Sequence, residues 1–295
     1  MPGRPAPSRL AIRRSLPWIA CAILGTVAVA CGLKASDQAQ NGDRLALRGP
    51  PDSAIPAGLL GTSIRRGRAL LVATRDSLPA NVGNRLSCVN CHLDGGRRMS
   101  GTWVGVYGRY PQYRSRSNAI ESIQDRVNEC FRRSMNGTRI APDGPDMRDI
   151  VAYFAFLSRG VPVGPPPSGT SPLARWASFK ADTAAGRETF RVVCAGCHGP
   201  EGGGTSAAPP LWGPQSYNIG AGMARVRTAA AFIAENMPFD RPGSLTDQQA
   251  FDVASYVNAQ PRPDFADKIY DWPNGDAPPD VAYRTLGADR RAKAP

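Results

Sequence analysis

The sequence predicts an all-α fold of two domains, and a five-residue motif that occurs twice is the main reason for this prediction. The run Cys-x-x-Cys-His stands at Cys88–His92 and again at Cys194–His198. Such a run attaches c-type haem, because its two thiols form thioether bonds to the porphyrin and its histidine supplies one axial ligand to iron. Two zinc knuckles would need further pairs of Cys or His ligands, and neither motif has such a pair at the usual spacing.

The predicted cofactors are therefore two covalently bound haem c groups. The chain has only two histidines, and both lie in these motifs. The sixth ligand of each iron must then be another residue type or water. The predicted attachment residues are Cys88, Cys91, Cys194 and Cys197, and the predicted axial histidines are His92 and His198.

Apolar residues around each motif recur at helical spacing, as is typical of class I cytochrome c domains. In the first domain a helical pattern starts at Thr62, and Asp146–Ser158 is expected to be the closing helix. Between them, Ser117 or Asn118 is expected to cap a further helix. The apolar face of that helix would contain Ile120, Ile123, Val127 and Phe131.

The second domain is expected to repeat this plan. A helix over Asp182–Val193 leads to the second motif, and the last helix begins with a capping box of Thr246 and Gln249. Proline and glycine are frequent in Gly160–Pro172, which is typical of a linker. The predicted organisation is a signal peptide (1–30), a flexible leader (31–60), an N-terminal cytochrome c domain (61–159), a linker (160–175), a C-terminal cytochrome c domain (176–262) and a tail without an assigned function (263–295).

The start of the sequence predicts export to the periplasm. Several arginines precede an apolar run over Leu16–Ala30, as in a signal peptide. Ala28–Ala30 fits a signal-peptidase site, while Cys31 could instead carry a lipid. A membrane is expected as a partner only if Cys31 is lipidated or the leader stays uncleaved. The net charge is +12, but the compartment and the lack of a binding motif argue against nucleic acid.

The main candidates for the sixth ligand lie between each motif and the closing helix of its domain. For the second haem the candidates are Met237, which stands just before the last helix, and Met223. For the first haem the main candidate is Cys130, a thiol left over in an oxidising compartment. The other candidates for the first haem are Met135, Met99 and Met147.

A thiolate ligand at the first haem would make the two haems differ in potential. An anionic thiolate stabilises ferric iron, whereas methionine raises the potential, so electrons would run from the first haem to the second. Arginines gather in the sequence around Cys130, and guanidinium groups beside a thiolate suit a small dianion. These arginines are Arg109, Arg114, Arg116, Arg126, Arg132, Arg133 and Arg139.

Three stretches of the chain resemble the dihaem thiosulfate dehydrogenases, also called tetrathionate synthases. They are Val104–Tyr107 with Tyr110–Arg114, Asp125–Gly137, and Pro209–Pro214. The resemblance covers roughly residues 61–259. It implies that Cys130 is the distal ligand of the active-site haem, and that Arg116, Arg126 and Ser134 hold thiosulfate. Some members place a lysine before the methionine of the second haem, where this sequence has Asn236.

The reaction that the resemblance implies joins two thiosulfate ions into tetrathionate and releases two electrons. The expected acceptor is external, either a small soluble cytochrome or a high-potential iron-sulfur protein. Two alternatives stay open from the sequence. One is a dihaem electron-transfer cytochrome without its own substrate, and the other is a thiosulfate-conjugating cytochrome subunit of a sulfur-oxidising complex.

Overall fold

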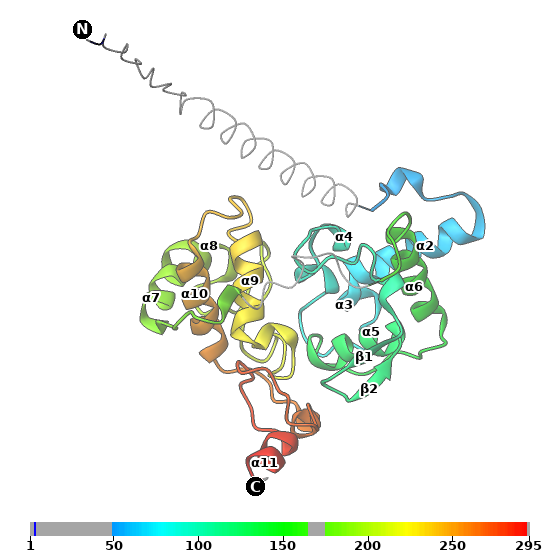
Figure 1. Cartoon of the computed structure of the whole chain (residues 1–295). Coiled ribbons are helices and arrows are strands. Elements are labelled where there is room, and N and C mark those ends of the chain that lie inside the picture. The colour runs from blue at the N-terminus through cyan, green and yellow to red at the C-terminus, as the bar shows by residue number, and fades with distance from the viewer. Residues whose placement is uncertain (1–2, 4–48, 165–174, 294–295) are drawn as a thin grey trace. The chain divides into compact units, whose positions relative to one another are not determined.

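The computed structural model describes residues 3, 49–164 and 175–293 (Figure 1). Its contacts divide the chain into Met1–Leu45 and Ala46–Pro295. The predicted signal peptide, Cys31, much of the leader and most of the linker lie outside the described residues. Within the described residues, no helix is both long enough and apolar enough to cross a membrane.

In the sequence, the first haem motif lies between the helices α2 (Gly58–Val72) and α6 (Pro145–Leu157), which pack against each other. The crossing is close, because a Cβ on Gly67 would lie 1.9 Å from the carbonyl oxygen of Asp149. Helix α2 begins at Gly58, so the prediction that the helix starts at Thr62 and that the leader runs to residue 60 placed this boundary too late. The closing helix agrees with the predicted one within one residue at each end.

Short elements connect these two helices. The helical ones are α3 (Thr74–Ser77), α4 (Leu93–Gly96) and 3₁₀ turns at Asp52–Ala54, Cys88–Asn90 and Tyr107–Arg109. They are followed by an antiparallel hairpin of β1 (Gln112–Arg114) and β2 (Ala119–Glu121), in which Tyr113 pairs with Ile120.

The hairpin corrects the predicted start of the next helix. Helix α5 (Ile123–Arg133) begins only after Ser122, whose side chain accepts a hydrogen bond from the Asp125 amide in a capping box. Ser117 and Asn118 instead lie in the turn before β2, where Asn118 has a φ of 54°. Asparagine tolerates this left-handed conformation better than most residues. The turn therefore interrupts the helical pattern, and Ile120 belongs to a strand.

The second motif, like the first, has helices before it and after it in the sequence. Helix α7 (Thr183–Thr189) continues as a π-helical turn over Phe190–Cys194 into α8 (Ala195–His198). After a 3₁₀ turn at Gly222–Ala224 come α9 (Val226–Asn236) and α10 (Asp247–Ala259). The capping box of Thr246 and Gln249 is present at the start of α10, as predicted.

The crossing of α7 with α10 repeats the crossing of α2 with α6. A Cβ on Gly186 would lie 2.1 Å from the carbonyl oxygen of Asp252. Gly186→Ala is therefore expected to lower the free energy of unfolding by about 1–3 kcal/mol or more, because it overpacks a helix contact. Thermal unfolding of the purified protein measures this. Gly203→Ala is the control, since a Cβ on Gly203 would meet no other atom within 4 Å; equal melting temperatures for the two variants would contradict the close crossing.

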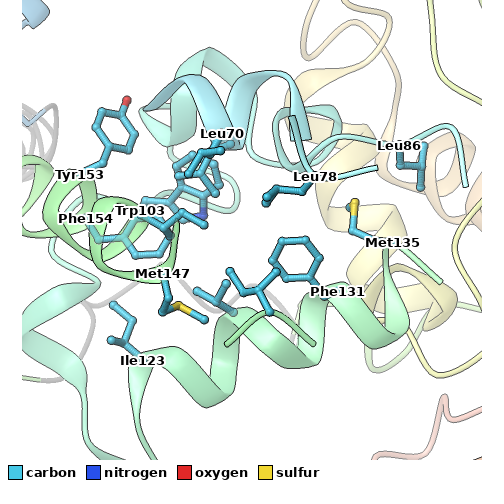
Figure 2. Close-up of a cluster of buried hydrophobic side chains, with 14 of the residues drawn as sticks. Leu70, Leu78, Leu86, Trp103, Ile123, Phe131, Met135, Met147, Tyr153 and Phe154 are labelled. Atoms are coloured by element: carbon cyan, nitrogen blue, oxygen red, sulfur yellow. The ribbon is translucent and has the colours of Figure 1, made fainter. Parts of the chain in front are cut away.

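The buried core of the first helical set surrounds the haem motif. Figure 2 shows side chains of α5 and α6 facing Leu70, Leu78 and Trp103. Tyr217, Ala221 and Ala224, which come after the second motif in sequence, belong to this same cluster. A second cluster surrounds Trp176, and a third joins Phe190 to Val253 and Val257.

The tail also has defined structure. It contains a 3₁₀ helix at Ala266–Tyr270 and the short helix α11 (Leu286–Ala292). Its residues contact the first domain: the Trp272 amide donates to the carbonyl oxygen of Arg116 at 2.8 Å. The tail is therefore part of the packed structure.

Candidate active site

Each motif histidine is oriented in a way that suits haem ligation. Nδ1 of His92 lies 2.5 Å from the carbonyl oxygen of Gly101, and Nδ1 of His198 lies 2.8 Å from that of Pro209. A carbonyl only accepts, so Nδ1 carries the proton and the lone pair of Nε2 is free for a metal. The ring of His92 also stacks on Trp103, with centroids 4.8 Å apart.

The four motif thiols are placed at the same two sites. Cys88 and Cys91 span the 3₁₀ turn before His92, and Cys194 and Cys197 span the turn that leads into His198. All four are free cysteines. Together with the oriented imidazoles, these thiols fit covalent haem at both motifs.

Helix α5 presents a thiol, a guanidinium and a hydroxyl at intervals of four residues. Arg126, Cys130 and Ser134 are all half-buried. Residues four apart lie on the same face of a helix. The helix continues through this stretch, because the Ser134 amide donates to the carbonyl oxygen of Cys130 at 2.8 Å. The structure thus brings three of the four predicted catalytic residues onto one face.

Cys130 lies close enough to several ionisable groups to affect them electrostatically. Of the groups around Arg126, Cys130 contributes most to raising the pKa of that arginine. It also adds to burial in raising the pKa of Cys88 and of Cys91, each to about 12. Cys130 therefore lies in electrostatic range of both attachment thiols of the first motif.

Tyr110 and Arg114 belong to the same surroundings, although the sequence assigned them no separate role. Burial raises the pKa of Tyr110, while the charges of Arg126 and Arg114 oppose that rise. Arg114 lies at the end of β1. The position of Arg114 therefore depends on the hairpin, which the sequence analysis did not predict.

Arg116, the fourth predicted catalytic residue, lies in the turn between β1 and β2 and not on α5. Its Nη1 donates to the carbonyl oxygen of Gly220 at 2.7 Å, and its guanidinium lies 4.6 Å from the ring centroid of Trp272. Burial, helped by the charge of Arg133, lowers the pKa of Arg116 to about 10. The one hydrogen bond of its guanidinium within the described residues is to this neutral oxygen.

Arg225 is a candidate that the sequence analysis missed. It lies just before α9, and its Nε is buried without a hydrogen-bond partner among the described residues. Burial lowers the pKa of Arg225; the charges of Asp280 and Tyr283 oppose this, and those of Arg114 and Arg126 add to it. Arg225 stands 95 positions after Cys130, so no local pattern in the sequence could have associated the two.

The candidate methionines differ in their surroundings. Met135 and Met147 are buried in the core of the first helical set, and Met99 is 38% exposed. Met237 directly follows α9 and is half-buried, whereas Met223 packs against two apolar clusters.

Comparison with known proteins assigns a family to this arrangement. A family model described as "SoxA/TsdA, cytochrome c domain" matches residues 80–163, and one described as "Cytochrome C oxidase, cbb3-type, subunit III" matches residues 181–257. The thiosulfate dehydrogenase of Psychrobacter arcticus is 42% identical over 239 residues, which is 79% of this chain and 73% of that protein. The chain belongs to the thiosulfate dehydrogenase family.

Two further members of this family extend the comparison. The thiosulfate dehydrogenase of Allochromatium vinosum is 40% identical over 259 residues, covering 84% of this chain and 93% of that protein. The solved structure of thiosulfate dehydrogenase (TsdBA) from Marichromatium purpuratum has 34% identity and a TM-score of 0.67. That match covers 80% of this chain but 54% of the other, so this chain spans about half of that longer one.

The comparisons confirm three predictions: the resemblance, the fold of two cytochrome c domains, and two covalently bound haem c groups. Family models match around both motifs, and each match contains one complete Cys-x-x-Cys-His run.

Proposed function

We propose that this protein oxidises two thiosulfate ions to one tetrathionate ion and passes the two electrons to an external acceptor. The observation that carries the proposal is the face of α5 on which Arg126 and Cys130 lie together near the first haem motif. Relatives named thiosulfate dehydrogenase, which match most of this chain, support the choice of substrate. Tetrathionate is the proposed product because it is the two-electron product of joining two thiosulfate ions.

Arg126 and Ser134 are the proposed substrate-binding residues on α5. A guanidinium beside a thiolate offers charge-assisted hydrogen bonds to sulfonate oxygens, and a hydroxyl one turn further adds a neutral donor. Arg116 is proposed as a further binding residue, because its bond to a neutral carbonyl leaves its charge available to an anion. These cations offset the repulsion between two dianions.

Cys130 is proposed to act as a nucleophile in two balanced steps. In the first, its thiolate sulfur and the terminal sulfur of one thiosulfate form an S–S bond, and two electrons leave. In the second, the terminal sulfur of another thiosulfate attacks the sulfane sulfur of this adduct, which forms tetrathionate and returns Cys130 as a thiolate. No proton is gained or lost in the sum.

The two haem c groups supply one-electron acceptors, so together they can take the electron pair. We propose that His92 and Cys130 would bind the iron of the first haem, and that His198 and Met237 would bind that of the second. The thiolate would lower the first potential relative to the second, which favours electron flow outward. A small soluble cytochrome or high-potential iron-sulfur protein in the periplasm is the proposed acceptor.

An anaerobic assay of the purified holoprotein tests the function. Thiosulfate with ferricyanide is expected to yield tetrathionate and ferrocyanide in a ratio of one to two, which chromatography and absorbance measure. The reverse assay uses reduced dye with tetrathionate. A protein that exchanges electrons with dyes but consumes no thiosulfate would instead be an electron-transfer cytochrome.

Replacement of each candidate methionine identifies the ligand of the second haem. Met237→Gly is expected to remove the near-infrared band of methionine-ligated ferric haem and to lower the potential of that haem, because a thioether ligand raises it. Met223→Gly is the matched control and is expected to retain the band. The opposite pattern would make Met223 the ligand.

A further inference from the structure

The tail residues 263–285, called the strap below, connect the end of α5 to the second domain. Asp271 in the strap forms two hydrogen bonds with Arg133, one to Nη1 and one to Nη2, each of 2.8 Å. Only 8% of the Arg133 side chain and 5% of the Asp271 side chain are exposed. A buried bidentate pair of this kind fixes both distance and orientation.

Other strap and helix groups complete this contact. The hydroxyl of Tyr283 donates to Asp271 at 2.5 Å, and Arg133 also pairs with Glu129 one turn back on α5. Burial alone would lower the pKa of Arg133, but Asp271 and Glu129 reverse this and raise it. The cation of Arg133 is thus matched by two carboxylates, so it is not available to a substrate anion.

The end of α5 is also held by a segment of the second domain. The last carbonyls of a helix have no partner within the helix. Here the carbonyl of Arg133 accepts from the Asn218 amide at 3.1 Å, and that of Arg132 accepts from the Asn218 side chain at 2.9 Å. The carbonyl of Gly220 in this segment accepts from both Arg116 and Arg133.

The strap in turn pairs with this segment. The Ile219 amide donates to the carbonyl oxygen of Pro263 at 3.0 Å. A Cβ on Gly220 would lie 2.8 Å from the ring of Phe265 and 2.9 Å from Nη1 of Arg133. Segment 216–220 is therefore enclosed between α5 and the strap, and Arg133 touches both.

We propose that Arg133 is a positioning residue: through Asp271 of the strap it holds the end of α5, and with it Cys130, in register with segment 216–220 of the second domain. This inference rests on the proposed function and adds a role for the tail. Helix α5 keeps its own apolar contacts in the first domain through Val127 and Phe131. Loss of the pair therefore affects the relation between the two haem domains more than the binding of substrate.

Asp271→Asn tests the role, because it keeps the shape and removes the charge. The matched control is Asp267→Asn, which removes a carboxylate that is 52% exposed and pairs with Arg132 from the same strap. Both variants are assayed as holoproteins with thiosulfate and ferricyanide. In Asp271→Asn we expect kcat to fall about 10-fold, as for a small misplacement of reacting groups. KM for thiosulfate is expected to stay within about 2-fold, because no substrate contact is removed.

Hydrogen exchange provides a readout that does not depend on thiosulfate. Peptides covering 130–136 and 216–220 are both expected to exchange faster in Asp271→Asn and to remain unchanged in Asp267→Asn. If wild type fails to oxidise thiosulfate but this exchange pattern appears, the proposed function fails and the positioning role stands.

Tyr283→Phe provides a milder second variant in case Asp271→Asn does not fold. It removes one hydrogen bond to Asp271 and is expected to change kcat and exchange in the same direction by less. A lower melting temperature with unchanged kcat would make the contact merely structural and would overturn the proposal. A raised KM with unchanged kcat would overturn it as well, because Arg133 would then serve substrate binding.

Discussion

Cys130→Ala is expected to abolish thiosulfate oxidation, lowering kcat by roughly 10³-fold or more, as removal of a nucleophile does. The variant should keep both haems, because attachment depends on Cys88, Cys91, Cys194 and Cys197. It should lose the electron paramagnetic resonance signature of thiolate-ligated ferric haem. The potential of the first haem should rise, because an anionic ligand has been removed.

Three measurements make this prediction specific. Denatured mass shows whether both haems remain attached, spectroscopy shows whether the second haem is unchanged, and the anaerobic assay gives the turnover. If Cys130→Ala retains near wild-type turnover, Cys130 is a packing residue. Met135 would then be the candidate ligand of the first haem, and the protein would be better described as an electron-transfer cytochrome.

Arg126→Gln is expected to have the second largest effect. Loss of a half-buried guanidinium that binds a dianion costs about 2–5 kcal/mol, or a fall in kcat/KM of about 30-fold to more than 10³-fold. Arg126→Lys should recover part of this loss, since it restores the charge but not the planar fork of donors.

Arg139→Gln is the matched control for Arg126→Gln. It removes the same charge from the same part of the chain, but the Arg139 side chain is 58% exposed, where a charge contributes little. Its kcat/KM should stay near wild type. If both glutamine variants lose the same activity, the effect comes from net charge, and Arg126 has no specific role in the site.

The parts of the fold that follow local patterns could be predicted from the sequence. The haem motifs, the closing helix α6 and the capping box of Thr246 depend on residues within a few positions of one another. The hairpin before α5 was missed because Ile120 and Ile123 fit helical spacing. The capping box at Ser122 separates Ile120, which lies in β2, from Ile123, which begins α5.

The part of the candidate site that lies on α5 could be predicted from the sequence. Cys130 was predicted as a leftover thiol, and the resemblance to a known family implied Arg126 and Ser134; these three residues lie at intervals of four at α5 and its end. Arg225 and Asp271 could not be found in this way, because their interactions with the residues of α5 join positions about 100 or more apart in the chain. The tail is rich in proline and charge, so there was no reason in the sequence to assign it a role. The structure shows that Asp271 of the tail pairs with the buried Arg133.

The order of Asp271 after both haem motifs in the sequence has a consequence for how the protein is assembled. During synthesis and export, both Cys-x-x-Cys-His runs and every proposed iron ligand emerge before Asp271 does. A fragment that stops short of this residue would contain both attachment motifs and every proposed iron ligand, yet Arg133 would remain a buried cation without its bidentate partner. The end of α5 therefore cannot be held by the strap until the chain has been made beyond both haem motifs.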